Sequence, residues 1–254
     1  MAPRALVAPD SFKGTFDAPT VARALSEGLR GAGWETDECP VADGGEGTLA
    51  LLVAALDGEL VEVAVRDPLG RRVRCAFGLV SGGATAIVEM AQASGLALVA
   101  PAERDAWRAS TAGTGELILA AAGSGAREIL VGVGGSATTD GGAGAIAAIR
   151  TGGGIGDARL RVLCDVEAAF EDAPRIFGPQ KGADRELVER LEQRLDTFAA
   201  TLPRDPRGVR FGGCAGGLSG GLWAAFGAEL CAGAPVVLDA LGVDARMRAA
   251  QLVV

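Results

Sequence analysis

Short apolar runs alternate with amphipathic segments along most of this chain. The run ALVAPD at residues 5–10 precedes a segment from Asp17 to Leu29 in which apolar side chains recur at helical spacing on one face. A second short run, TDECPVAD, follows at residues 36–43. Such alternation of strands and helices is typical of a parallel sheet covered by helices.

The pattern changes around residues 59 to 89. Three strand-like pieces, ELVEVAVRD, RRVRCAFGLV and ATAIVEM, are joined by the turn sequences DPLG and SGG. This stretch is consistent with a meander or with a crossover between two domains.

Helices and strands alternate again in the second half of the chain. Helical patterns lie near residues 115–121, 144–149, 184–202 and 218–229, with strand patterns at REILVGVGG and RLRVLCD between them. The last eight residues, MRAAQLVV, predict a helix that runs into a buried strand. We therefore expect an α/β protein built from two units.

Composition and charge exclude several partners. The net charge of −8, from 24 basic and 32 acidic residues without a basic cluster, argues against nucleic acid. The five cysteines are odd in number and form no CxxC pair, so they indicate buried thiols of a reducing compartment. No stretch offers the about 18 apolar residues of a membrane span, and the N-terminal apolar run is too short for a signal peptide, so we expect a cytoplasmic protein that does not contact membranes.

The chain contains no histidine and no tyrosine. A Ser-His-Asp triad, an HExxH zinc site and a tyrosine proton relay are therefore impossible. Any general acid or base must be Asp, Glu, Lys or Cys. The 39 glycines indicate many tight loops between strands and helices.

Candidate chemistry lies in five segments where a strand ends in small and acidic residues before a helix, the usual ligand-binding edge of an open α/β sheet. In the first, APDSFKGTFDAPT, Asp10 and Ser11 end the strand and Lys13 extends from the loop. Ser11 or Asp17 could simply cap the helix, and we favour that role for Asp17. We favour ligand binding for Lys13.

The next two segments support functional and structural interpretations about equally. PVADGGEGT, residues 40–48, surrounds two glycines with Asp43 and Glu46 and would expose backbone N–H groups to an anion, but a tight turn with a helix cap explains it as well. In ASTAGTGEL, residues 109–117, capping by Ser110 or Thr111 explains the hydroxyl groups as well as ligand contact does.

The fourth segment, VGVGGSATTDGGAGA at residues 131–145, offers N–H and O–H donors for phosphate and one carboxylate for Mg²⁺. It lacks the spacing of a P-loop. It does satisfy the GxGxxA dinucleotide fingerprint, although Asp157, the downstream acid, lies in a glycine-rich turn. The candidate cofactor-binding residues are Gly134, Gly135, Ser136, Thr138, Thr139 and Asp140, with Asp140 also the candidate metal ligand.

The fifth segment comprises VLCDV and FGPQKGA. Asp165 ends a strand, and Lys181 follows a Gly-Pro turn just before a charged helix, where a phosphate-binding lysine would be useful. Either residue alone could be a surface ion-pair partner. The glycine-rich stretch at residues 212–227 is better explained by close packing than by substrate access.

Taken in order, these segments resemble the glycerate kinase family. The matching segments run from the first strand to near residue 240: PDSFKGT, PVADGGEGT, STAGTGE, GVGGSATTDGGAG, CDV, FGPQKGA and AGGLSGGL. The resemblance implies a discontinuous Rossmann-like domain, residues 1–65 and 236–254, with a flavodoxin-like α/β domain inserted at residues 66–235 and the active site in the cleft between them. It also implies a first domain whose C-terminal part is missing, because the family pattern continues past the position of Val254.

The resemblance further implies ATP-dependent phosphorylation of D-glycerate to phosphoglycerate, with ATP and Mg²⁺ as cofactors and a homodimer as one possible assembly. Phosphoryl transfer depends mainly on positioning and charge stabilisation, and an aspartate base suffices for it. Asp165 is our first choice for that base, with Asp10 and Asp43 as rivals, while Lys13 and Lys181 neutralise anionic groups. Substrate binding is expected at Ser11, Asp43, Gly44, Gly45 and Glu46.

Two other functions remain open from the residues. One is an NAD(P)-dependent oxidoreductase that uses the loop from Gly132 to Ala137. The other is a ligand-binding remnant without catalytic activity.

Overall fold

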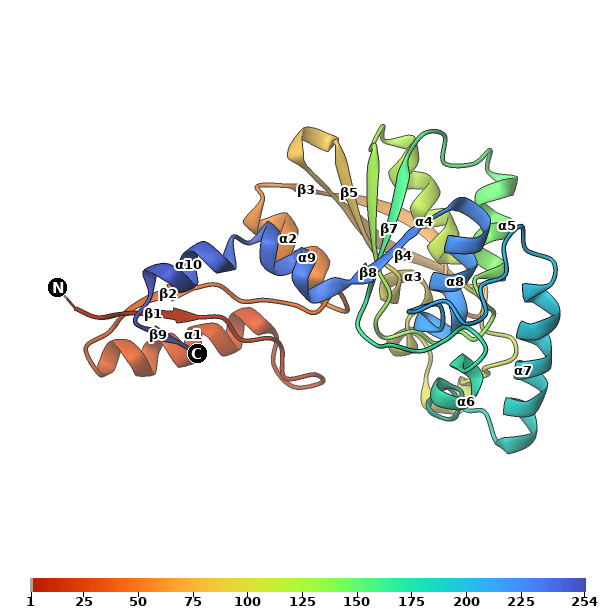
Figure 1. Cartoon of the computed structure of the whole chain (residues 1–254), viewed down its shortest axis with the longest axis horizontal. Coiled ribbons are helices and arrows are strands. Elements are labelled where there is room, and N and C mark those ends of the chain that lie inside the picture. The colour runs from red at the N-terminus through yellow and green to blue at the C-terminus, as the bar shows by residue number, and fades with distance from the viewer. Residues whose placement is uncertain (1) are drawn as a thin grey trace.

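The computed structural model describes residues 2–254, which form two α/β lobes of unequal size. The small lobe carries a three-stranded sheet in the order β2-β1-β9, and the large lobe a six-stranded sheet in the order β3-β4-β5-β6-β7-β8. Both ends of the chain lie on the small lobe, which extends to one side of the large one (Figure 1). The expected two-unit α/β architecture is thereby confirmed.

The small lobe is assembled from both ends of the chain. Strand β1 (Arg4–Val7) pairs in parallel with β2 (Glu35–Glu38) on one side and with β9 (Leu252–Val253) on the other. Helix α1 (Ala18–Gly31) joins β1 to β2, and the Asp17 carboxylate caps it by accepting the Thr20 N–H at 2.8 Å. The capping role expected for Asp17 is confirmed. The last strand was expected to be buried, but it is the edge of its sheet and Val253 is 46% exposed.

The large sheet has an antiparallel half and a parallel half. Strands β3, β4 and β5 form an antiparallel meander, and β5 to β8 run parallel to one another. The turn between β3 and β4 is held by Asp67, whose Oδ1 accepts the Leu69 and Arg71 N–H groups. The strands are β3 (Glu59–Arg66), β4 (Arg72–Val80), β5 (Thr85–Glu89), β6 (Glu128–Gly132), β7 (Arg159–Cys164) and β8 (Glu229–Ala232).

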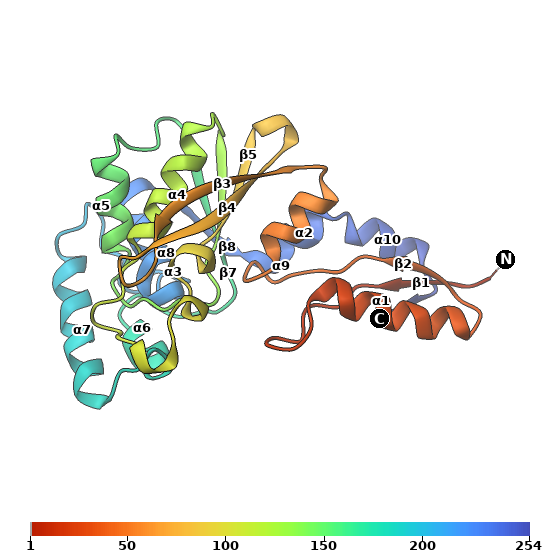
Figure 2. The same cartoon turned by 180° about the vertical axis from the view of Figure 1, so that it is seen from behind.

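Helices cover both faces of the large sheet (Figures 1 and 2). On one face, α4 (Ala112–Gly123), α5 (Ala143–Thr151) and α8 (Cys214–Phe226) bury side chains against alternate strand residues such as Val88, Val131 and Val162. On the other, α2 (Thr48–Ala55) and α9 (Gly233–Ala240) cover Ile87, Leu130 and Leu163. Burial on both faces explains the continuous apolar runs inside the central parallel strands β5 and β6.

The buried cluster beneath α2 and α9 also joins the two lobes. Leu6 of β1 belongs to the same buried cluster as Leu130 and Leu163 of the large sheet. Helix α10 (Val243–Ala249) leads from α9 back to β9. The remaining helices are α3 (Ala91–Ser94), α6 (Ala173–Phe177) and α7 (Arg185–Ala199), with short 3₁₀ turns at Ser81–Gly83, Leu96–Leu98, Pro101–Glu103 and Pro179–Lys181.

The domain divisions expected after residues 65 and 235 fall inside elements of the large lobe. Strand β3 pairs with β4 along its whole length, from Glu59 to Arg66. Helix α9 buries Val237 in the core shared with the large sheet. Helix α2 buries Leu49 and Leu52 in the same core. We therefore propose that the large lobe spans residues 48–240 and that the small lobe consists of the segments on either side.

Candidate active site

Lys13 projects from the loop after β1 toward the second loop of the small lobe. Its Nζ donates to Oδ2 of Asp43 at 3.0 Å, and the two side chains form an ion pair. The loop doubles back on itself, because the Phe12 N–H donates to the Phe16 carbonyl and Gly14 takes a positive φ of 82°. The expected ligand-binding lysine is thereby held over the start of the PVADGGEGT segment.

Three carboxylates from both lobes act on the Lys13 ammonium. The hydrogen bond with Asp43 contributes most to raising the pKa of Lys13, and the negative charges of Asp165 and Asp10 raise it further. Partial burial opposes ionisation of Asp43, but the Gly45 N–H and Lys13 together lower the pKa of its carboxyl group. The structure therefore brings together all three carboxylates that the sequence offered as candidate bases.

Asp165 is more exposed than Asp10 and Asp43 and has fewer polar partners. It follows β7 directly and its side chain is exposed, and it takes part in none of the ion pairs found among residues 2–254. Asp43 is committed to Lys13 and to the Gly45 N–H, and Asp10 accepts the Ser11 N–H at 2.6 Å. Of the three, the Asp165 carboxylate is therefore the freest to accept a proton from a ligand.

The paired glycines of the second and fourth segments pack against each other where the lobes meet. A Cβ on Gly134 would lie 2.8 Å from the Gly45 Cα, and one on Gly44 would lie 2.8 Å from the Gly233 Cα. Contacts this close leave no room for a side chain, so these glycines serve backbone packing. Gly135 and Glu46 remain exposed at this contact, with the Glu46 Oε2 atom 3.7 Å from where a Gly135 Cβ would stand.

Asp140, the expected metal ligand, is buried and engaged by the protein. Its Oδ2 accepts the Thr111 N–H and hydroxyl at 2.9 Å each and the Gly144 N–H at 3.1 Å, while its Oδ1 accepts the Gly142 N–H. The carboxylate thus joins the starts of α4 and α5. Among residues 2–254 no group of three acidic, cysteine or histidine side chains is placed to hold a metal ion. Because Mg²⁺ usually binds one or two carboxylates together with phosphate oxygens and water, the role of Asp140 as a metal ligand stays a prediction.

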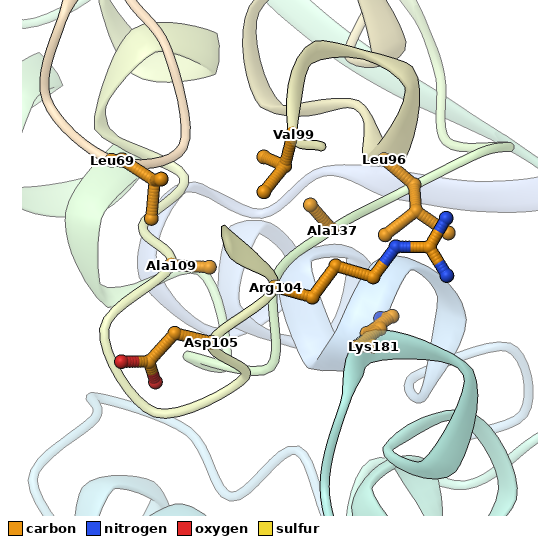
Figure 3. A pocket seen from close by; sticks show the side chains of 8 residues that line it. All are labelled: Leu69, Leu96, Val99, Arg104, Asp105, Ala109, Ala137 and Lys181. Carbon is orange, nitrogen blue, oxygen red and sulfur yellow. The ribbon is translucent and has the colours of Figure 1, made fainter. Parts of the chain in front are cut away.

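Lys181 is also buried, with 1% of its surface exposed. Its ammonium donates to the Ser136 hydroxyl at 2.8 Å and to the Thr138 carbonyl at 2.5 Å. Lys181 borders a crevice with no room for a water molecule. Figure 3 shows the side chains that line this crevice, among them the apolar Leu96 and Ala137 and the charged Arg104 and Asp105. Burial lowers the pKa of Lys181 to about 7, although the charge of Asp140 opposes that shift.

The loop from Gly134 to Asp140 therefore has an exposed beginning and a buried continuation. Gly134 and Gly135 reach the surface at the lobe junction, whereas Ser136, Thr138, Thr139 and Asp140 are buried. The hydroxyls of Thr138 and Thr139 are buried without a hydrogen-bond partner.

Comparison with known proteins agrees with this geometry. The sequence profile of the glycerate kinase family matches residues 5–153 and 150–254, which together cover nearly the whole chain. The chain belongs to the glycerate kinase family. Its relatives include the glycerate 2-kinase of Escherichia coli K12, 37% identical, and the glycerate kinase of Bacillus subtilis 168, 38% identical. Each alignment covers 98% of this chain and 75% of the relative.

A solved structure in the same family has the same fold. The crystal structure of a Salmonella typhimurium LT2 protein assigned as glycerate kinase 2 superposes with a TM-score of 0.85 at 37% identity, over 100% of this chain and 78% of that one. Family membership identifies the chain as a kinase that uses ATP and acts on a small molecule. No helix within residues 2–254 is long and apolar enough to cross a membrane.

The glycerate kinase assignment leaves the oxidoreductase and remnant alternatives without support. In dinucleotide-binding folds the glycine loop opens directly into a helix. Here residues 133–142 separate β6 from α5, and Asp157 lies before β7, at the opposite end of that strand from Asp165.

Sequence reasoning missed Glu89 at this site. It is the last residue of β5, 5% exposed, and its Oε1 accepts the Leu49 N–H at the start of α2 at 2.7 Å. Burial raises the pKa of Glu89, and nearby Glu46 adds to the shift. A carboxylate that directly follows a buried apolar run was the available signal.

Proposed function

We propose that this member of the glycerate kinase family transfers the terminal phosphoryl group of ATP to a hydroxyl group of D-glycerate. The observation that carries the proposal is the Lys13 ammonium held at the lobe junction among Asp43, Asp10 and Asp165. A cation placed there can neutralise the carboxylate of glycerate or the charge that develops on the transferred group.

The chemistry assigns one role to each group. The glycerate hydroxyl oxygen attacks the terminal phosphorus as the bond to the ADP oxygen breaks, and the Asp165 carboxylate accepts the hydroxyl proton. Lys13 holds the negative charge, Asp43 fixes the position of Lys13, and Ser11, Glu46 and the Gly44–Gly45 backbone border the substrate. Lys181 acts from beneath, by holding the loop that begins at Gly134.

We propose that Mg²⁺ arrives with ATP, because phosphate oxygens and water are its usual ligands. Five free cysteines fit a reducing compartment, so we also propose that the protein acts in the cytoplasm.

The test is ADP release from Mg·ATP with D-glycerate, using L-glycerate as the control substrate. We expect D-glycerate-dependent turnover, and we expect Asp165→Asn to lower kcat by about 100-fold or more, as loss of a general base does. Asp157→Asn is the matched control, because it removes an exposed carboxylate at the opposite end of β7.

Two results would contradict the proposal. ADP release that does not depend on glycerate would show that glycerate is not the phosphoryl acceptor. An unchanged kcat in Asp165→Asn would show that Asp165 is not the general base. In the second case the same assay on Asp10→Asn and Asp43→Asn identifies which rival takes its place.

A further inference from the structure

A groove on the large lobe lies apart from the Lys13 cluster and shares only Asp140 with the residues described above. It encloses about 500 Å³ between α7, the start of α5 and the loop that precedes α4. Trp107, Arg190 and Arg194 line it, and Asp140 and Ala143 form its inner end. We call it the α7 groove. Its volume is in the range of pockets that bind small molecules.

The groove carries two guanidinium groups stacked on one indole ring. The Arg190 and Arg194 guanidinium carbons lie 4.7 Å and 4.9 Å from the centre of the Trp107 ring. Arg194 also donates to the Trp107 carbonyl at 2.6 Å. Neither arginine takes part in an ion pair among residues 2–254, so a chain of net charge −8 concentrates unpaired positive charge here.

Asp140 forms no ion pair with these arginines. It lies at the inner end of the groove, but its oxygens accept hydrogen bonds from Thr111, Gly142 and Gly144. The groove therefore combines flat aromatic and guanidinium surfaces with free N–H donors. That combination suits an anionic ligand with a planar ring, because bases stack on such surfaces and guanidinium groups bind phosphate and ribose oxygens.

One loop connects the α7 groove to the active site. The loop begins at Gly134, in contact with Gly45 at the lobe junction, and ends at Asp140 in the groove. Its seven residues span at most about 25 Å. Helix α7 lies on the side of the large lobe away from the small lobe (Figures 1 and 2). The groove is therefore at the end of the 134–140 loop that is farther from the lobe junction.

We propose that the α7 groove binds the base and ribose of an adenine nucleotide, whose phosphates extend from the groove toward the exposed Gly135 and Lys13. The terminal phosphate must reach the lobe junction to react, so the opposite end of the nucleotide falls in the groove. This inference rests on the proposed kinase activity and assigns the nucleotide to one part of the molecule.

The test compares ATP binding, measured by calorimetry without glycerate, in variants of the groove. Arg190→Gln/Arg194→Gln keeps helix-forming residues on α7 and removes both charges. We expect its Kd for ATP to rise at least tenfold while KM for glycerate stays within twofold. Arg185→Gln is the matched control on the same helix, because Arg185 is 94% exposed and lies outside the groove.

A Kd for ATP that is unchanged in the folded double variant overturns the inference. If the double variant does not fold, Trp107→Leu removes the aromatic ring but keeps an apolar side chain, and a Kd for ATP within twofold of the wild-type value overturns the inference instead. Competition by inorganic phosphate but not by adenosine also overturns it, because the groove then recognises only an anion.

Failure of the two proposals can be told apart. Normal turnover with ATP affinity independent of the groove removes the nucleotide assignment and leaves the kinase activity. Groove-dependent ATP binding without turnover on glycerate removes the proposed reaction and leaves the nucleotide assignment.

Discussion

The Lys181 ammonium lies 2.8 Å from the Ser136 hydroxyl oxygen, fully buried beneath the loop that follows β6. The contact joins the helical turn after α6 to a loop that begins at the lobe junction and ends beside α5. Burial lowers the pKa of Lys181 to about 7, far below the value of about 10.4 for a lysine in an unfolded chain. Stability should therefore depend on pH through this one residue.

Lys181→Met is the variant that tests this dependence. Between pH 7 and 9 the unfolded wild-type chain holds its lysine proton while the folded chain loses it, so the free energy of unfolding rises with pH. The slope is at most about 1.4 kcal/mol per pH unit, and the whole gain is about 2 kcal/mol. In Lys181→Met we expect the free energy of unfolding to rise less between pH 7 and 9, because the methionine side chain carries no proton to lose.

Urea unfolding at pH 7, 8 and 9 measures the difference. Lys13→Met is the control, because Lys13 is mostly exposed and the pKa of its ammonium is raised rather than lowered. Parallel pH curves for the wild type and Lys181→Met would show that Lys181 stays charged in the folded protein.

Glu89 gives a pH effect of the opposite sign. Burial raises the pKa of Glu89, so the folded state binds its proton more strongly than the unfolded state does. The stability that this gives is fully present below the unfolded value of about 4.3 and is lost as pH rises through the folded pKa. We expect Glu89→Gln, which titrates no proton, to gain stability relative to the wild type as pH increases over this window.

Comparing Glu89→Ala with Glu89→Gln separates the effect of Glu89 titration on stability from the effect of its hydrogen bond to the Leu49 N–H. Glutamine keeps an acceptor for the Leu49 N–H, but alanine leaves that N–H unpaired at the start of α2, which costs about 1–3 kcal/mol. Thermal unfolding from pH 4 to 8 measures both variants. Equal stability of Glu89→Gln and Glu89→Ala at pH 7 would show that this acceptor does not support the helix.

Elements with a strong pattern were predictable from sequence because their signals are local. The helix after Asp17, the three strands of the meander and the buried runs before Gly132 and Asp165 all appear within a few residues of where the pattern places them. Strand β8 and helix α9, by contrast, are short and were not expected. Their apolar residues have partners only in the assembled core.

The candidate site was predictable as a set of segments but not atom by atom. Lysine is rarely buried, so nothing in FGPQKGA predicts that Lys181 lies beneath a loop. The acceptor role of Asp140 depends on Thr111, which is 29 residues away. The α7 groove likewise depends on Trp107 meeting a helix that begins 78 residues later, at Arg185. Such pairings arise from tertiary contacts that spacing along the chain does not encode.

Gly134 tests whether the paired glycines serve packing between the lobes. A Cβ at this position would stand 2.8 Å from the Gly45 Cα, a backbone atom that cannot rotate away. We expect Gly134→Ala to lower the free energy of unfolding by about 1–3 kcal/mol, as overpacking does. Activity should fall with it, because Lys13, Asp43 and Asp165 come from the elements that this contact holds together.

Gly28→Ala is the matched control for that substitution. Gly28 lies inside α1 with nothing within 4 Å of its Cβ position, and alanine there should stabilise the protein by about 0.5–1 kcal/mol through helix propensity alone. Urea unfolding and turnover are measured for both variants. If Gly134 packs against Gly45, the free energy of unfolding falls in Gly134→Ala and rises in Gly28→Ala. If Gly134→Ala unfolds like Gly28→Ala yet loses activity, the glycine serves ligand approach instead, because only a bound nucleotide would then need the space.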